Sequence, residues 1–179
     1  RLYERKIYRE GTDTILPYLQ AARNPYLVFW AELPQVDYNT DCLRLIRPIA
    51  LQVAERTKSF SGNTIGVHIR RTDNIRSIQN SPLTLFIEKM RQELATHPDT
   101  KFYVASDSMQ EKQELANLFP DKIITVWKET NRSSRQGIEE ALVELYTLAA
   151  TRKILGSAGS SYSMLAGKIG KIPVEIVSK

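Results

Sequence analysis

The residues best suited to chemistry in this sequence lie together in one short run. Residues 64–69 are mostly β-branched or apolar and predict a strand, which ends in His68, Arg70, Arg71 and Asp73. Side chains alternate across a strand, so His68 and Arg70 share one face. Guanidinium groups donate paired hydrogen bonds to phosphate oxygens. We therefore predict a diphosphate site with Arg70 as its main ligand and Arg71 as a second ligand or a brace for Asp73 or a loop; a surface salt bridge is the alternative.

A second candidate is the small-residue segment 156–163. Glycine allows the backbone to approach an anion closely, and serine hydroxyls and the first N–H groups of a following helix bind phosphate oxygens. The segment matches neither the Rossmann nor the P-loop fingerprint. A tight turn with a serine cap is the alternative interpretation. The candidate ligands are Ser157, Ser160, Ser161 and Ser163.

Two carboxylates complete the set. Asp107 follows a predicted strand at 101–106, where it can bind a ribose, orient an arginine or cap the next helix. Glu144 lies in a predicted helix at about 138–151, where a solvated face is the plain alternative.

Predicted strands and helices alternate from residue 64 to the end, which is typical of a Rossmann-like α/β parallel sheet with helices on both faces. Such sheets bind ligands at the carboxyl ends of their strands, where the three polar clusters fall. Before residue 64 we expect a strand at 26–30 and a helix after 43 that Pro48 kinks or splits. Residues 74–81 read as a long polar turn.

Composition narrows the function classes. The chain has 179 residues, a net charge of +5 and basic and acidic residues mixed along its length, so we expect no nucleic-acid partner. It has no apolar run of transmembrane length, and its single cysteine, Cys42, favours a reducing, cytoplasmic compartment, with peripheral membrane contact left open. The cysteine and two histidines, His68 and His97, do not match a metal site.

Residues 68–73 resemble the His-x-Arg-Arg-x-Asp motif of the fucosyltransferase superfamily, which includes α-1,6, α-1,2 and protein O-fucosyltransferases. The sequence Arg-Arg-Thr-Asp is most similar to the motif in the α-1,6 branch, which includes the nodulation enzymes. Residues 103–107 look like the second motif of that family, and residues 157–163 look like its third. The resemblance covers about residues 60–179.

The resemblance implies the C-terminal donor domain of a GT-B glycosyltransferase. It implies metal-independent, inverting transfer of a sugar, fucose from GDP-fucose, to a glycan or other hydroxyl acceptor, with the GDP-sugar as co-substrate and no cofactor. Arg70 would contact the β-phosphate, His68 would line the nucleotide pocket, and Ser160 and Ser161 would lie at the phosphates. Glu144 stands near a family residue that reads the guanine edge.

We accordingly divide the chain into residues 1–58, a helical or irregular remnant or edge of an acceptor lobe, and residues 59–179, a Rossmann-like domain that binds a nucleotide sugar. A non-catalytic module that binds the same nucleotide sugar is the alternative function.

Overall fold

The structure is a computed structural model, and it describes residues 40, 43–72, 74–128 and 134–179. All structural statements below refer to these residues. Thr40–Lys179 form one compact unit. The strand predicted at residues 26–30 lies outside the described residues, as do Cys42 and Asp73.

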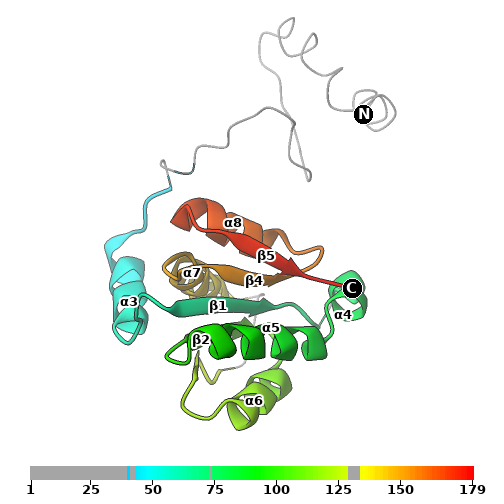
Figure 1. The fold of residues 1–179 in the computed structure, drawn as a ribbon. Coiled ribbons are helices and arrows are strands. Elements are labelled where there is room, and N and C mark those ends of the chain that lie inside the picture. Colours follow the sequence, from blue (N-terminus) through cyan, green and yellow to red (C-terminus); the bar gives the residue numbers. More distant parts are fainter. Residues whose placement is uncertain (1–39, 41–42, 73, 129–133) are drawn as a thin grey trace, which may run out of the picture. The chain divides into compact units, whose positions relative to one another are not determined.

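A five-stranded parallel sheet forms the centre of this unit, with the strands in the order β3-β2-β1-β4-β5. The strands are β1 (Thr64–Ile69), β2 (Lys101–Ser106), β3 (Ile123–Thr125), β4 (Ile154–Ser157) and β5 (Val174–Val177). The chain places β2 and β3 on one side of β1 and then returns to place β4 and β5 on the other side (Figure 1). The strand order therefore reverses between β1 and β4, and the predicted Rossmann-like α/β class is confirmed.

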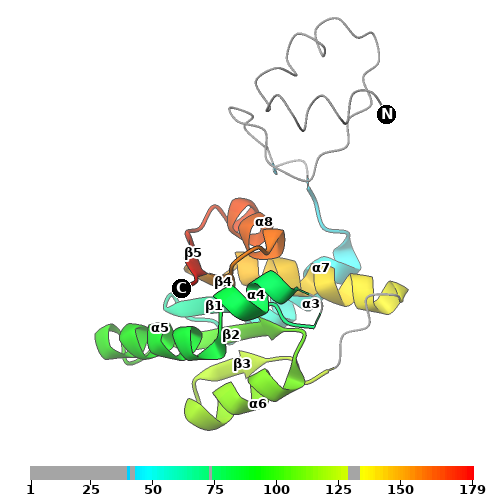
Figure 2. The ribbon, with the colours of Figure 1, turned by 90° about the vertical axis from the view of Figure 1, so that its right-hand side faces the viewer.

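Helices cover both faces of the sheet (Figures 1 and 2). They are α3 (Arg47–Thr57), α4 (Ile75–Asn80), α5 (Leu83–Thr96), α6 (Met109–Leu118), α7 (Arg135–Ala149) and α8 (Ser161–Gly170). Apolar residues of α5 and α6 pack on one face, and those of α7 and α8 pack on the other. The short helix α4 lies at the carboxyl edge of the sheet, the edge that faces the reader in Figure 2.

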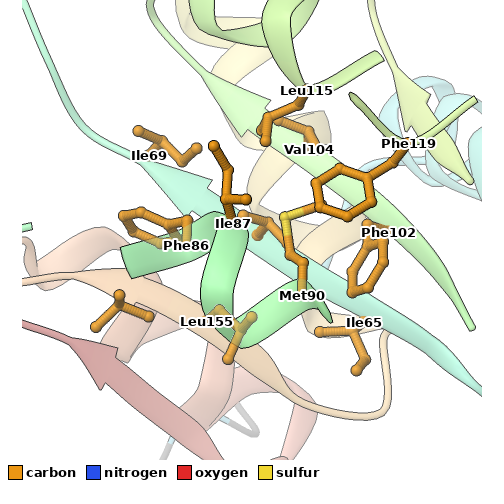
Figure 3. Packing of buried hydrophobic residues seen from close by; sticks show 12 residues of the cluster. Ile65, Ile69, Phe86, Ile87, Met90, Phe102, Val104, Leu115, Phe119 and Leu155 are labelled. Atoms are coloured by element: carbon orange, nitrogen blue, oxygen red, sulfur yellow. The ribbon is translucent and has the colours of Figure 1, made fainter. Parts of the chain in front are cut away.

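The larger core cluster lies between the sheet and helices α5 and α6 (Figure 3). Ile65 and Ile69 of β1 meet Phe86 and Met90 of α5 there, and all four side chains are fully buried. Alternation along β1 turns Gly66 and His68 to the opposite face. Every second residue of β1 therefore packs in this core cluster, and the residues between them face α7.

Gly66 sets how closely α7 approaches the sheet. A Cβ atom on this residue would lie 2.9 Å from Leu148 Cδ2 of α7 and 3.0 Å from Thr151 Oγ1. The first contact is shorter than real Cβ contacts and the second is tighter than most of them, so α7 packs directly on the backbone of β1 because residue 66 has no side chain.

Two local predictions differ from the structure. Residues 75–80, predicted as part of a turn, form helix α4, which begins where the Asn74 side chain accepts a hydrogen bond from the Ser77 N–H. The residues of α4 show no buried apolar stripe, which is why periodicity did not reveal it. Pro48 does not kink the helix near residue 43; α3 begins at Arg47 instead, so Pro48 stands in the first turn, where its missing N–H is not needed.

The division predicted between residues 58 and 59 falls inside the compact unit, in the loop that joins α3 to β1. Helix α3 packs along α7, and Arg56 of α3 forms an ion pair with Glu140 of α7. These contacts join α3 to the same body as the sheet.

Candidate functional site

Several of the predicted site residues follow strands at the carboxyl edge of the sheet, around the point where the strand order reverses. Arg70 and Arg71 follow β1, Asp107 follows β2, and residues 158–160 follow β4. Because β1 and β4 are parallel neighbours, their carboxyl ends lie side by side at the same edge of the sheet. This is the position at which doubly wound α/β sheets bind ligands.

Arg70 connects all three strand ends. Its main-chain N–H donates to the Ser157 hydroxyl at 3.0 Å, and its Nη1 donates to Asp107 Oδ2 at 2.7 Å. The ion pair is largely enclosed, with 13% of the Arg70 side chain and 5% of the Asp107 side chain exposed. Asp107 therefore fixes the direction of the guanidinium group.

Asp107 also organises the turn after β1. Its Oδ1 accepts the Arg71 main-chain N–H at 2.8 Å, and its Oδ2 accepts the Thr72 hydroxyl at 2.8 Å. Burial alone would raise the pKa of Asp107, but the hydrogen bonds from Arg70, Thr72 and Arg71 together lower that pKa below its usual value. The residue that caps α6 is not Asp107 but the following Ser108.

Each nitrogen of the Arg71 guanidinium group donates a hydrogen bond within the protein. Its Nε donates to Glu111 Oε1 at 2.5 Å, its Nη2 donates to the Ser81 carbonyl at 3.0 Å, and its Nη1 donates to the Arg70 carbonyl at 3.0 Å. Arg70 pairs with Asp107 whereas Arg71 pairs with Glu111, and Arg71 braces the start of α5 against α6.

The turn after β4 is held by α4. The Ser81 hydroxyl accepts the Ala158 N–H at 2.8 Å, the Ser77 hydroxyl donates to the Ala158 carbonyl at 2.6 Å, and Asn74 Nδ2 donates to the Gly159 carbonyl at 3.2 Å. Gly159 has a φ of 69°, which favours glycine. These bonds couple the Gly/Ser turn to the segment that carries Arg70.

The four predicted serines take different places. Ser157 is buried, accepts from Arg70 and donates to the His68 carbonyl, and Ser163 is buried and donates to the Ser160 carbonyl. Ser160 is the N-cap residue of α8 without a side-chain capping bond, and Ser161 is exposed in the first turn. Ser160 and Ser161 therefore stand beside the N–H groups at the start of α8, where the helix dipole attracts anions.

His68 lies under this edge. Its ring centroid is 4.9 Å from that of Tyr162, and its Nδ1 atom is buried without a hydrogen bond to any described residue. Burial lowers the pKa of His68 to about 4, assisted by the charge of Arg70 and opposed by that of Asp107. The imidazole is therefore neutral at physiological pH, with one polar atom unsatisfied.

Glu144 belongs to a group of charged and polar side chains from α3, β2, α6 and α7, which we call the polar cluster. Its members are Arg56, Tyr103, Lys112, Glu140 and Glu144, which influence one another electrostatically. Burial raises the pKa of Glu144 to about 7, although Lys112 and Arg56 lower it. Tyr103 and Lys112 are buried and the other three side chains are partly exposed, so water competes with the donors and acceptors of the cluster only in part.

Sequence reasoning missed Arg56, Tyr103 and Lys112. Lys112 is 1% exposed, and its Nζ donates to the Val126 carbonyl at 3.1 Å. The available signal was its position three residues before Leu115, which places both on one helical face.

Among the described residues, no group of three or more histidine, cysteine, aspartate or glutamate side chains is arranged to hold a metal ion. No helix in the described part of the chain has the length and apolar character needed to cross a bilayer.

No family model and no curated protein matches this chain, but solved structures do. NodZ α-1,6-fucosyltransferase soaked with GDP-fucose is 25% identical, with a TM-score of 0.51 over 70% of this chain and 43% of NodZ. POFUT1 in complex with GDP is 13% identical, with a TM-score of 0.52 over 75% of this chain and 47% of POFUT1. POFUT1 in complex with GDP-fucose is 11% identical, with a TM-score of 0.53 and the same two coverages.

The chain therefore has a fold that it shares with part of these fucosyltransferases, and it spans less than half the length of either protein.

Proposed function

We propose that this chain is the donor-binding part of a fucosyltransferase of the α-1,6 type, which binds GDP-fucose and transfers fucose with inversion and without a metal. One observation carries the proposal: the Arg70 N–H donates to the Ser157 hydroxyl at 3.0 Å, so the arginine-bearing end of β1 and the Gly/Ser turn after β4 meet at one edge. The likeness to NodZ, at 25% identity, supports the same assignment.

The chemistry follows from charge. Departure of GDP from the sugar builds negative charge on the diphosphate, and without a metal this charge needs cations and oriented N–H groups. Arg70 supplies the cation, held in direction by Asp107. The first turn of α8, with Ser160 and Ser161, supplies hydroxyl and N–H donors from the other side. Arg70 is the proposed catalytic residue because it would touch the leaving phosphate.

The nucleoside would lie deeper, toward the polar cluster. Neutral His68, stacked near Tyr162, would line the pocket, with its unsatisfied Nδ1 available to the nucleotide. The Glu144 carboxylate would accept the adjacent N–H groups of the guanine edge, an arrangement that adenine and uracil do not offer. Arg71, Ser157 and Ser163 would act indirectly, by holding the strand ends and the turn in place.

The acceptor in this proposal is a glycan or other hydroxyl compound. We assign no general base, because the described residues at the edge are committed to the donor.

The first test is calorimetry and thermal shift with GDP and GDP-fucose, compared with UDP and ADP. We expect GDP and GDP-fucose to bind and to raise the melting temperature, by about 2.7 kcal/mol of stabilisation at a hundredfold excess over Kd. Release of fucose from GDP-fucose, to water or to a glycan acceptor, then reports turnover. Equal affinity for all three nucleoside diphosphates would contradict the guanine assignment. Binding without turnover would favour the non-catalytic module.

A further inference from the structure

Helix α4 and the residue that follows it bury their serines and expose their isoleucines. Ser77 and Ser81 are completely buried, whereas Ile75 is 69% exposed and Ile78 is 43% exposed. A buried hydroxyl is costly unless it forms hydrogen bonds, and apolar side chains are normally the ones that gain by burial. The place of this segment in the structure therefore depends on what its serines bind rather than on apolar packing.

Both serine hydroxyls bind the main chain of one residue, Ala158. The Ser81 hydroxyl accepts the Ala158 N–H at 2.8 Å, and the Ser77 hydroxyl donates to the Ala158 carbonyl at 2.6 Å. We call these two serines the serine clamp. Because the clamp binds the N–H and the C=O of the same residue, it fixes both the position and the orientation of the chain just after β4. Gly159 and then the start of α8 at Ser161 follow directly.

The strand pairing of the sheet ends before this turn. The register between β1 and β4 ends with the pair His68 and Gly156. Beyond that pair, hydroxyl groups join the two segments: Ser157 accepts the Arg70 N–H, and the serine clamp binds Ala158. The separation between residue 70 and the start of α8 is therefore set by side chains, and a single substitution can change it.

The serine clamp is itself anchored to the chain that follows β1. The Ser81 carbonyl accepts a hydrogen bond from Arg71 Nη2 at 3.0 Å, and Arg71 forms an ion pair with Glu111 of α6. The Ser81 N–H donates to the Ser77 carbonyl at 2.9 Å, which ties the two serines to each other. Polar contacts thus run without a break from α6 through Arg71 and Ser81 to Ala158.

We propose that Ser77 and Ser81 are positioning residues that set the distance between the Arg70 guanidinium group and the first turn of α8, so that both reach one diphosphate. The part that concerns the turn is a property of the protein alone; the ligand rests on the proposed function. Preorganised donors need no rearrangement as charge develops, and a misplacement of about 1 Å can lower a rate by about 10²-fold. The serine clamp would act on the diphosphate through α8, without touching it.

Amide hydrogen exchange of the full chain, resolved by NMR, tests whether the clamp holds the turn. In Ser77→Ala and in Ser81→Ala we expect the Ala158 N–H to exchange about tenfold faster than in the wild type, because one hydrogen bond to that residue is lost. Val67 and Val104, in the central strands, report any general loss of stability. An Ala158 rate that rises only by the same factor as theirs would overturn the inference.

Thr151→Val is the matched control. Thr151 is also buried, and its hydroxyl donates to the Leu148 carbonyl at 2.7 Å and to the Lys153 carbonyl at 3.1 Å. It precedes β4 and so lies at the opposite edge of the sheet from the serine clamp. We expect this variant to lower the melting temperature, as the serine variants do, and to leave both turnover and the exchange of Ala158 relative to Val67 unchanged. A specific rise at Ala158 in the control would count against the clamp.

A double-mutant cycle with Arg70→Ala tests the link to the proposed reaction. We expect Ser81→Ala to lower the rate of fucose release from GDP-fucose by about tenfold when Arg70 is present. In the Arg70→Ala background the same substitution should lower the rate by less than about threefold, because no arginine is left to align with α8. Loss of folded protein would lower the rate by the same factor in both backgrounds, so equal factors would refute the positioning role. Ser77→Ala takes the place of Ser81→Ala if the latter does not fold.

The outcomes separate this inference from the proposed function. If the wild type neither binds GDP nor releases fucose from GDP-fucose, the proposed function fails, and the ligand named here fails with it. If the wild type does both and the folded serine variants match its rate, the proposed function stands and this inference fails. If the wild type binds GDP without turnover, the same cycle is measured as GDP affinity by calorimetry, and equal factors in the two backgrounds again overturn the inference.

Discussion

Replacement of Arg70 by alanine tests the central step of the proposed reaction. The Arg70 main-chain N–H is bonded to Ser157, and its guanidinium group is bonded to Asp107, so this side chain is held at the edge that carries the Gly/Ser turn. Loss of one preorganised donor to a developing anion lowers turnover by about 10²–10³-fold, equivalent to about 3–4 kcal/mol of transition-state stabilisation. We expect a loss of this size in the rate of fucose release from GDP-fucose.

The same substitution also affects folding, because Asp107 is nearly buried. Without Arg70, its Oδ2 retains the Thr72 hydroxyl and its Oδ1 retains the Arg71 N–H. A buried carboxylate that loses the hydrogen bond from its arginine destabilises the fold by about 1–3 kcal/mol, and the bonds that remain favour the low end of that range. Urea unfolding monitored by circular dichroism measures this term.

Two further variants separate the effects. In Arg70→Ala/Asp107→Asn the unpaired charge is removed, so stability should recover while turnover stays low. Arg135→Ala removes an arginine whose side chain is 93% exposed and pairs with Glu139 on the same helix, and it should leave both properties unchanged. Wild-type turnover by a folded Arg70→Ala protein would show that the diphosphate is neutralised in another way.

Three other predictions follow from particular contacts. Gly66→Ala should destabilise the fold by about 1–3 kcal/mol, because its Cβ meets Leu148 at 2.9 Å, and urea unfolding would contradict this if the midpoint did not move. Wild-type affinity for GDP should fall as the pH drops below about 7, because Glu144 gains a proton. Comparison with Glu144→Gln removes the pH dependence that comes from titration of the GDP phosphate itself. Parallel pH profiles of the two proteins would argue against a role for the carboxylate. Because the pKa of His68 falls from 6.5 to about 4 on folding, its contribution to stability is complete above pH 6.5 and is lost toward pH 4, by about 3 kcal/mol. His68→Asn should therefore flatten the dependence of the unfolding free energy on pH in this range. An identical dependence in the variant would disprove the lowered pKa of His68.

Much of the fold could be predicted because its signals are local. The strands β1 and β2 are short apolar runs followed at once by charged or polar residues, and the helices α5 and α6 carry apolar stripes. The order of these elements defines the sheet through the rules for parallel connections. The position of Arg70 and Arg71 just after β1 could be predicted for the same reason, since it depends only on where the strand ends.

The remainder depends on contacts between distant segments. Helix α4 exposes Ile75 and Ile78 and is stabilised by polar bonds to residues about 80 positions away, which leave no local pattern. Lys112 resembles any surface lysine until the path of its side chain past β3 is known. The polar cluster likewise joins α3, α6, α7 and β2, and it could be recognised only once these elements were placed.

The segment that joins β1 to α5 has the composition of a tolerant surface loop, yet its hydrogen bonds give it a different character. Asn74, Ser77 and Ser81 hold the backbone of residues 158 and 159 while Arg70 stands only a few positions earlier. An insertion here would change the position of Arg70 relative to the Gly/Ser turn. Engineers who seek a site for a tag, a circular permutation or a grafted peptide should therefore avoid residues 70–81 and use the exposed end of α6 near Leu118 instead.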